Sequence, residues 1–473
     1  MRPGCVVVLD VGKTLAKLTM WSPERRLLRR RDYRNKRVTS DGYPALDVGG
    51  IETWLTETLK DFSQLGDIVA IVPVGHGAAA CLIDDDGLCL APLDYEAEPP
   101  AELRAHYLSL RDPFALTGSP SLPAGLNLAV QLLWLETIAP DRAARGLIVT
   151  WPQYWAWRLC GVAATEVSSL GCHTDLWMPA AGRPSPMAVN RGWAKRLAPL
   201  HHAGDLLGSV SAEWRDRCTL PNDCLVLCGL HDSNAALWAM RGYPEVGGRE
   251  CTVLSTGTWF VAMRSGPADA KIDLAPLHES RDCLVNVDVA GKPVPSARFM
   301  GGREVELIEV PTASPVDLKA KKNLLVHTAE TMIKDGVFVL PTFQKGVGPF
   351  PANVGRWERQ QPADQLGRRA MAGLYLALVA NVSLDLIDSK DTLVIEGRFV
   401  DDPVFTRALA ALRSKQQIYL SYASNCLAYG TLRLIDAHLP PQDVLTRVEP
   451  LNADLANYAR LWHSMAQYVE AAA

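Results

Sequence analysis

A carboxylate directly follows an apolar segment near the middle of the chain. Residues 224–236 read CLVLCGLHDSNAA, so that Asp232 comes after a run of apolar residues and a glycine. Burying a carboxylate costs free energy unless it is paired, hydrogen-bonded or used in a reaction. Asp232 therefore either caps the helix that we expect to begin here, since Asp is a favoured N-cap residue, or accepts a proton from a substrate hydroxyl. The two roles are compatible.

Polar residues also occupy the turn of a hairpin predicted near the N-terminus. The segment VVVLDVGKTLAKLTMW places Asp10, Gly12, Lys13 and Thr14 between two apolar strands. They do not form a Walker A loop, because that motif requires glycine at position 7, where the chain has valine. We expect Asp10 to hold Mg²⁺ through water and the other three residues to bind phosphate. An ordinary polar hairpin tip is the alternative interpretation.

A second predicted turn resembles the first in composition. The segment CTVLSTGTWFVAMR places Ser255, Thr256, Gly257 and Thr258 between two apolar strands. Backbone N–H groups and hydroxyls in such turns bind phosphate oxygens. Two turns of this kind that face each other would form a clamp for one phosphate chain.

A third group of residues combines hydrogen-bonding groups with aromatic rings, as the binding of a polyhydroxylated ligand requires. His76 has glycine on both sides in VGHG, which lets a ligand approach it closely. For each residue of this group, an ordinary place in a loop or in the core is the alternative. The candidates for substrate binding are His76, Gly77, Asp94, Tyr95, Gln153, Tyr154 and His231.

The elements that must position these residues alternate between apolar runs of strand length and longer segments of helical period, which indicates an α/β architecture. We expect strands at residues 5–12, 16–22, 67–75, 80–87, 224–230, 251–257, 259–265, 336–341 and 392–397. We expect helices at residues 51–65, 128–139, 153–161, 232–242, 366–388, 402–414, 426–438 and 455–472.

The chain is long enough for two domains. Its 473 residues exceed the range over which one hydrophobic core keeps growing. The two hairpins with polar turns suggest that each domain begins in the same way, so we predict two related halves. Glycine and proline concentrate at residues 242–250, and we place the boundary there, with domains at 1–245 and 246–473.

Composition excludes several classes of protein. The chain is 48% hydrophobic and 21% charged, which is typical of a globular protein with a sizeable core. Its formal net charge of −4 argues against nucleic acid as the main partner. Residues 24–37, ERRLLRRRDYRNKR, are locally basic; we interpret them as a solvated hairpin face in which Leu27, Leu28 and Tyr33 can still pack inward, with anion or partner binding as the alternative.

The cysteines and the termini indicate a compartment. The eleven cysteines are odd in number and include no CxxC pair, so we expect reduced thiols rather than disulfides or a zinc site. We find no secretory signal and no apolar run of about 18 residues that could span a membrane. We therefore expect a cytoplasmic protein without a membrane partner. The sequence leaves the oligomeric state open, a homodimer included.

Several motifs, taken in order along residues 5–435, resemble a known family. They are DVGKT, VGHG, TGSPSLPAGLNLAVQLLWL, CGLHDSNAA, STGTWF and VIEGRFVDDPVF. This order resembles the FGGY carbohydrate kinases, which include rhamnulokinase, fuculokinase, xylulokinase and glycerol kinase. The resemblance implies the two-domain, actin-like ATPase (ribonuclease H-like) fold, with ATP and sugar bound in the cleft between the domains.

The resemblance also implies roles for individual residues. Asp232 matches the catalytic base of the family, and the turns at 10–14 and 255–258 match its two phosphate motifs. His76 matches a histidine beside the sugar in xylulokinase-like members. Glu396, Gly397 and Arg398 occupy the place of the adenosine motif, which is usually a run of glycines. The N-terminal domain would then hold the sugar, the first phosphate loop and the base, and the C-terminal domain the nucleotide.

The sequence thus predicts an ATP- and Mg²⁺-dependent kinase that phosphorylates a hydroxyl of a small sugar, most simply a ketose or deoxyketose of the L-rhamnulose, L-fuculose or pentulose type. A sugar-binding regulator with weak catalysis is the alternative, because Glu396 and Arg398 replace the usual glycines. An actin-like or chaperone-like ATPase is a third reading, which the VGHG and PQYW segments disfavour.

Overall fold

A computed structural model describes residues 2–267, 272–309 and 321–470, which form two compact units. Unit 1 comprises residues 1–242, 285–293 and 425–441, and unit 2 comprises residues 243–284, 294–424 and 442–473. The first division lies within the predicted boundary region. The division differs from the predicted 1–245 and 246–473 in one respect, because two later segments return to unit 1.

The main sheet of unit 1 has the strand order β14–β15–β6–β1–β2–β3, with the short strand β16 also paired to β6. Strand β1 is antiparallel to β2 and parallel to β6. The strands are β1 (Cys5–Val11), β2 (Leu15–Trp21), β3 (Leu27–Arg34), β6 (Ile68–Gly75), β14 (Leu206–Ser209), β15 (Leu225–Leu227) and β16 (Leu230–His231). The predicted strand 224–230 is therefore divided in two at Gly229.

The second large sheet repeats this topology in the order β25–β24–β23–β17–β18–β20–β19. Here β17 is antiparallel to β18 and parallel to β23, as β1 is to β2 and β6. The strands are β17 (Cys251–Thr256), β18 (Phe260–Ser265), β19 (Cys283–Val287), β20 (Pro293–Phe299), β23 (Thr392–Gly397), β24 (Gln417–Leu420) and β25 (Thr446–Arg447). The prediction of two related halves, each beginning with a hairpin, agrees with this repeated order.

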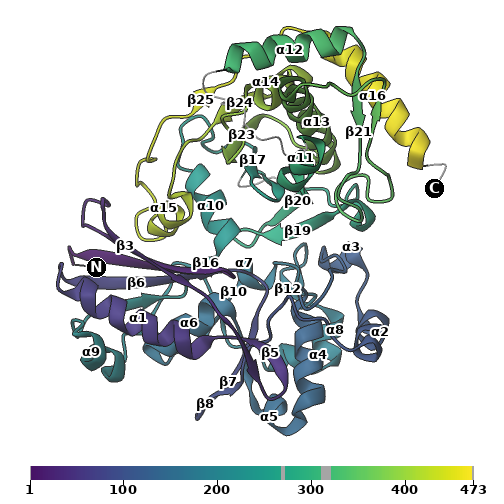
Figure 1. The fold of residues 1–473 in the computed structure, drawn as a ribbon. Coiled ribbons are helices and arrows are strands. Elements are labelled where there is room, and N and C mark those ends of the chain that lie inside the picture. The colour runs from purple at the N-terminus through teal and green to yellow at the C-terminus, as the bar shows by residue number, and fades with distance from the viewer. Residues whose placement is uncertain (1, 268–271, 310–320, 471–473) are drawn as a thin grey trace. The chain divides into compact units, whose positions relative to one another are not determined.

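Helices cover both faces of the unit 1 sheet (Figure 1). Alternate residues of β1 point to opposite faces. Val7 and Leu9 pack with α1 (Val48–Ser63) and α6 (Trp151–Cys160), whereas Val6 and Val8 pack toward α10 (Asp232–Met240) and α15 (Cys426–Leu432). A central strand buried on both faces must be apolar throughout, which explains the uninterrupted run before Asp10.

Unit 1 also contains a three-stranded sheet in the order β8–β7–β9. Its strands are β7 (Ala80–Asp84), β8 (Gly87–Leu90) and β9 (Leu147–Thr150). The accompanying short strands are β4 (Arg37–Ser40), β5 (Tyr43–Leu46), β10 (Thr165–Glu166), β11 (Trp177–Met178), β12 (Arg183–Pro184) and β13 (Leu200–His201). The helices are α2 (Ala101–Leu110), α3 (Phe114–Thr117), α4 (Leu128–Ile138), α5 (Pro140–Arg145), α7 (Val167–Leu170), α8 (Pro186–Asn190), the 3₁₀ turn η1 (Trp193–Lys195) and α9 (Ala212–Cys218).

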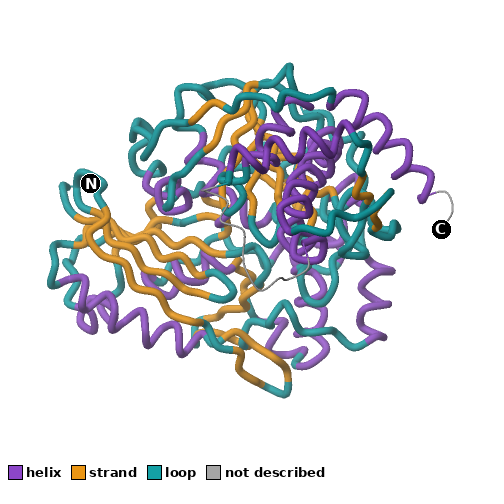
Figure 2. Tube along the Cα trace, turned by 45° about the horizontal axis from the view of Figure 1, so that its top comes forward, coloured by secondary structure: helices purple, strands orange, loops and turns teal. Residues whose placement is uncertain are grey.

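Unit 2 is built around α13 (Gln365–Leu386), the long helix visible among its neighbours in Figure 2. By length and hydropathy α13 could cross a membrane, which the sequence analysis overlooked, but 83% of its apolar window is buried inside the protein. It is therefore a core helix. The remaining elements are the 3₁₀ turn η2 (Glu279–Arg281), α11 (Gly301–Glu309), α12 (Lys322–Lys334), β21 (Phe338–Leu340), β22 (Arg356–Glu358), α14 (Pro403–Leu412) and α16 (Leu455–Glu470).

The basic segment 24–37 contributes the edge strand β3 of the first sheet. Leu27 and Leu28 are exposed, so the expectation that they pack inward is wrong. Tyr33 does pack, with its ring stacked on Trp54 of α1. Charged side chains along an edge strand discourage pairing with the edge of another sheet. The arginines of β3 thus form a solvated face that protects this edge.

The contact between α10 and α15 predicts a sharp difference between two helical glycines. A methyl group at Gly430 of α15 would lie 1.8 Å from the carbonyl oxygen of Ala235 in α10, whereas one at Gly49 of α1 would meet nothing within 4 Å. We expect Gly430→Ala to destabilise the protein by about 1–3 kcal/mol through overpacking. The control Gly49→Ala should leave stability unchanged or slightly raised. Equal denaturation midpoints for the two variants would show that α15 moves away from α10 at little cost.

Candidate active site

The carboxyl end of β1 carries an ion pair. Asp10 lies opposite Lys17 in the β1–β2 register, and Lys17 Nζ is 3.0 Å from Asp10 Oδ2. Burial raises the pKa of Asp10 to about 6; Lys17 opposes this shift, and the negative charge of Asp232 adds to it. Two carboxylates thus influence each other beside one lysine. Lys17 was not predicted, although residues 10 and 17 are equidistant from the middle of the hairpin turn, which is a signal that could have found it.

The turn after Asp10 has a fixed backbone. The N–H of Gly12 donates to the carbonyl of Leu15 at 3.1 Å, and the side-chain amide of Asn35 donates to the carbonyl of Gly12 at 2.7 Å. Thr14 is exposed, as a residue that binds an external phosphate must be. Lys13 forms an ion pair with Asp94 and lies over the ring of Tyr95. The structure therefore brings together Lys13, Asp94 and Tyr95, which the sequence had assigned to two separate groups.

Asp232 is the first residue of α10, and His231 is the N-cap residue. Asp232 was expected to be the N-cap residue, but the N-cap position lies one residue earlier. The Asp232 carboxylate accepts the backbone N–H of Ser233 at 2.6 Å and its hydroxyl at 3.1 Å, while 29% of the side chain stays exposed. Burial raises its pKa, whereas Ser233 and the charge of Lys17 lower it. A carboxylate with a raised pKa at an accessible helix start has the properties of a general base.

His231 supports Asp232 from the buried side. The amide nitrogen of Asn234 lies 3.2 Å from His231 Nδ1 and can only donate, so the imidazole proton belongs on Nε2. Nε2 lies 3.2 Å from Asp232 Oδ1 and 3.3 Å from Cys172 Sγ. Burial lowers the pKa of His231 to about 4, so the ring is a neutral donor near pH 7. His231 was predicted to bind substrate, but its hydrogen bonds assign it to positioning Asp232.

A buried glutamate anchors this arrangement. Glu166 is 0% exposed and accepts four hydrogen bonds from the backbone and hydroxyls of Ser168 and Ser169 at 2.6–3.3 Å. The Ser168 hydroxyl in turn accepts the backbone N–H of His231 at 3.2 Å. A continuous chain of polar contacts therefore runs from Glu166 to the residue before Asp232. Glu166 was not predicted, because no periodic or motif signal distinguishes a glutamate of this kind.

His76 follows β6 and presents one unused polar atom. Its Nδ1 accepts the backbone N–H of Ala78 at 3.2 Å, which puts the proton on Nε2. Nε2 is buried and has no hydrogen-bond partner among the described residues. Burial, and secondly the charge of Lys13, lower the pKa of His76 to about 3, so the ring is neutral. Tyr95 packs edge-on against it with the ring centroids 5.3 Å apart. His76 therefore offers an N–H donor that lacks an acceptor.

Close packing of Gly77 completes this region. A methyl group at Gly77 would lie 2.5 Å from Cys172 Sγ and 3.2 Å from the His231 ring. The absence of a side chain thus lets the segment after β6 contact the support of Asp232. Gly77 has this packing role rather than a demonstrated contact with a substrate.

Three residues that were predicted to bind substrate are buried and already make contacts within the protein. Tyr154 is 2% exposed and belongs to the hydrophobic core between α1, α6 and the sheet, so burial argues against a contact with sugar. Gln153 is also buried, and its amide nitrogen donates to the carbonyls of Cys228 and Gly229 at 3.2 and 3.1 Å. Asp94 is 1% exposed and ion-paired. Gln153 and Tyr154 therefore have core positions, which was the alternative interpretation of both residues.

The turn after β17 adjoins the predicted adenosine motif within unit 2. Thr256 lies opposite Gly397 in the parallel β17–β23 register, and the N–H of Arg398 donates to the Thr256 carbonyl at 2.6 Å. Gly397 has φ +91°, and a methyl group there would lie 2.3 Å from the Thr256 oxygen, so only glycine fits. The Thr256 hydroxyl donates to the carbonyl of Glu396 at 2.5 Å and is therefore used internally. Thr258 is exposed.

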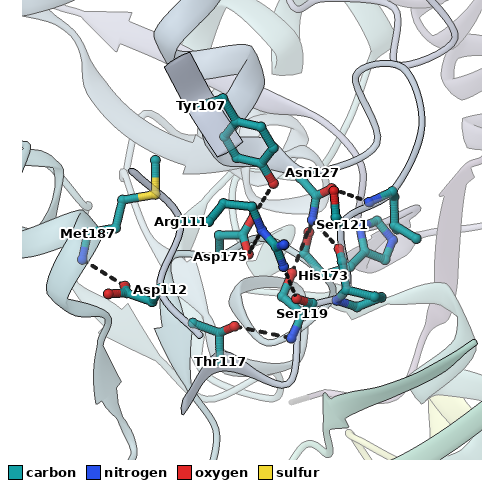
Figure 3. A network of polar contacts seen from close by, with 12 residues as sticks. Tyr107, Arg111, Asp112, Thr117, Ser119, Ser121, Asn127, His173, Asp175 and Met187 are labelled. Carbon is teal, nitrogen blue, oxygen red and sulfur yellow. Dashed lines mark hydrogen bonds and ion pairs between the residues drawn. The ribbon is translucent and has the colours of Figure 1, made fainter. Parts of the chain in front are cut away.

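A separate buried network holds the segment 117–127, which carries one of the family-like motifs (Figure 3). Asp175 contacts the hydroxyl of Tyr107 and Nε of Arg111, and Arg111 donates to the carbonyl of Ser119 at 2.6 Å. Asn127 donates to the Ser119 hydroxyl at 3.1 Å. Burial raises the pKa of Asp175 to about 6, against the opposing effect of Arg111. The network fixes the backbone that precedes α4.

The buried position of Glu166 predicts a dependence of stability on pH. Burial raises its pKa from 4.5 to about 7 despite the serine donors. A carboxyl with a raised folded-state pKa contributes stability that is complete below pH 4.5 and is lost as the pH rises through about 7. The stability advantage of wild type over Glu166→Gln should therefore shrink by about 3 kcal/mol across this range.

Unfolding free energies measured between pH 5 and 8 check this expectation. Glu98→Gln is the matched control, because Glu98 is exposed and its substitution should give no such trend. A difference between wild type and Glu166→Gln that stays constant with pH would contradict a protonation change at Glu166.

Comparisons with known proteins identify the family and the fold. Residues 248–443 match the family model described as "Carbohydrate kinase FGGY, C-terminal domain". The structure of a carbohydrate kinase from Novosphingobium aromaticivorans is 46% identical, with a TM-score of 0.94 over 99% of this chain and 100% of that chain.

More distant structures share the fold. A xylulose kinase from Rhodospirillum rubrum is 17% identical, with a TM-score of 0.74 over 99% of this chain and 98% of that chain. Plasmodium falciparum glycerol kinase with ADP is 11% identical, with a TM-score of 0.74 over 98% of both chains. The fold is thus the mixed α/β, two-domain, actin-like fold of sugar kinases. The chain belongs to the FGGY family of carbohydrate kinases, which are phosphotransferases.

Proposed function

We propose that the protein phosphorylates one hydroxyl of a small neutral sugar with ATP, with Asp232 as the general base. The sugar is a ketose or deoxyketose of the L-rhamnulose, L-fuculose or pentulose type. One observation carries this proposal: Asp232 is a partly exposed carboxylate with a raised pKa, held at a helix start by Ser233 and His231.

The reaction follows from the properties of these groups. The sugar hydroxyl oxygen forms a bond to the γ-phosphorus, and the bond from that phosphorus to the β–γ bridging oxygen breaks, so that ADP leaves. Asp232 accepts the hydroxyl proton as the new bond forms. His231 donates to Oδ1 of Asp232 and keeps the carboxylate in place.

The donor of His76 supports a polyhydroxylated acceptor. A buried N–H without an acceptor costs about 1–3 kcal/mol, which a bound sugar oxygen would recover. The ring is neutral, and Lys17 is already paired with the carboxylate of Asp10. These features favour an uncharged sugar over a sugar acid. Tyr95 beside His76 supplies an aromatic face for the same ligand.

Asp10 fits a magnesium ion that retains most of its water. Mg²⁺ is commonly bound by one or two carboxylates together with substrate phosphates. Asp10 is a buried carboxylate near the end of β1, directly before the turn that we assign to phosphate. When bound, Mg²⁺ neutralises charge on the β- and γ-phosphates. The ion pair with Lys17 holds the Asp10 carboxylate in position.

The phosphate and adenosine contacts follow the family motifs. We assign phosphate binding to Gly12, Lys13 and Thr14 in unit 1. In unit 2, we assign phosphate binding to Ser255, Gly257 and the exposed Thr258, and nucleoside binding to residues 396–398. From the odd number of cysteines and the lack of a CxxC pair in the sequence, we propose a reducing, cytoplasmic location.

Replacement of the base is the main test of this function. Asp232→Asn should keep the fold and sugar binding but lower kcat by at least about 10²-fold, because general-base assistance is lost. Release of ADP in a coupled assay, with a panel of ketoses, aldoses and sugar alcohols, measures the effect. Asp61→Asn, an exposed position in α1, is the matched control and should turn over normally.

Two results would contradict the proposal. Near-normal turnover by folded Asp232→Asn would remove Asp232 from the reaction. Sugar binding by wild type without ADP release from any sugar of the panel would favour the sugar-binding regulator.

The assignment of Asp10 gives a separate prediction. Asp10→Asn removes a charge from the magnesium side of the site, so it should weaken binding of a non-hydrolysable Mg·ATP analogue more than binding of the sugar. Titration calorimetry measures both affinities on the same preparation. An equal loss of both affinities would be the contrary result.

A further inference from the structure

The ion pair of Lys13 with Asp94 joins two parts of unit 1 that the proposed function keeps separate. Lys13 lies in the hairpin turn assigned to phosphate, whereas Asp94 lies in the loop that carries Tyr95. The two residues are 81 positions apart in the chain and are in direct contact. Lys13 Nζ also lies 4.8 Å from the centroid of the Tyr95 ring.

Asp94 does not depend on Lys13 for its charge balance. Lys13 contacts Oδ1, while Arg37 Nε donates to Oδ2 at 2.6 Å. The backbone N–H of Glu96 adds a third donor at 2.9 Å. A buried carboxylate left without any cation is strongly destabilised, but Asp94 would keep Arg37 if Lys13 moved away. Lys13 is therefore the exchangeable partner.

The turn allows the lysine side chain to move without the backbone. Asn35 holds the carbonyls on both sides of the turn, since its side chain donates to Gly12 at 2.7 Å and its backbone N–H donates to Thr14 at 2.9 Å. The four-carbon stem of Lys13 is flexible and ends in a compact charge. Movement of the ammonium group between two acceptors thus needs only changes in side-chain torsions.

The position of Lys13 affects His76. Both side chains contact Tyr95, since Lys13 Nζ lies over its ring and the His76 ring packs edge-on against it. The charge of Lys13 is also one of the causes that lower the pKa of His76. A displacement of Lys13 must therefore change both the packing of Tyr95 and the electrostatic environment of His76.

We propose that Lys13 exchanges between Asp94 and a phosphate oxygen of the donor, and so couples donor binding to the Tyr95–His76 part of the sugar site. Lys13 is then a positioning residue for the acceptor as well as a ligand of the donor. This inference rests on the proposed function, because it takes the turn at residues 12–14 to bind phosphate. Coupling is reciprocal, so bound sugar would alter donor affinity by the same factor.

The test uses inorganic tripolyphosphate as the probe, so that no sugar has to be known. The full-length protein is labelled at histidine, and the His76 imidazole signals are assigned with His76→Gln. Tripolyphosphate should shift the His76 signals saturably in wild type and in Lys36→Met, a matched control at an exposed lysine. In Lys13→Met the His76 signals should stay still at saturating probe.

A second variant guards against a failure of Lys13→Met to fold. Asp94→Asn releases Lys13 in advance, so tripolyphosphate should bind at least about fivefold more tightly by calorimetry, the low end of typical coupling factors. The His76 response to the probe should also be smaller than in wild type.

The outcomes separate this inference from the proposed function. An active kinase in which tripolyphosphate binds without moving the His76 signals overturns the inference alone. The same holds if Lys13→Met retains the wild-type His76 shift. A wild type that neither binds tripolyphosphate nor releases ADP overturns the proposed function, and the inference with it.

Discussion

The parallel pairing of β1 with β6 is the constraint on which the candidate site depends. Parallel strands end at the same edge of a sheet, and here Val11 of β1 and His231 of β16 both lie beside Gly75 at the end of β6. Asp10, His76 and Asp232 each lie within one residue of that edge. No side chain has to reach far, because the backbone register alone brings together the carboxylates of Asp10 and Asp232 and the neutral imidazole of His76.

The kink at Gly229 is what makes this register possible. A straight strand from 224 to 231 would continue past β6, but Gly229 takes φ +78° and divides the segment into β15 and β16. A methyl group at this position would lie 2.0 Å from the carbonyl oxygen of Pro73. The buried amide of Gln153 secures the same bend by donating to the carbonyls of Cys228 and Gly229. Backbone freedom and one hydrogen-bonded side chain together set where α10 begins.

The sequence allowed the fold and the family to be predicted, because apolar runs, turn residues and ordered motifs are local signals. The two hairpins were identified from residues that stand within twenty positions of each other. Side-chain partners were harder to predict: Lys13 meets Asp94 across 81 positions, and Glu166 acts through Ser168 on His231. Tyr154 illustrates the opposite error, since an aromatic residue in a helix suits a ligand site and a core equally well until its burial is known.

The chain crosses between the two units several times, which limits where it can be cut into fragments. The chain passes from one unit to the other at residues 242/243, 284/285, 293/294, 424/425 and 441/442. Neither unit is therefore a continuous piece of the gene. A fragment that stops at residue 242 would lack α15 and expose the face of the first sheet that this helix covers. A shortened protein that keeps either unit intact must therefore join separate segments of the chain.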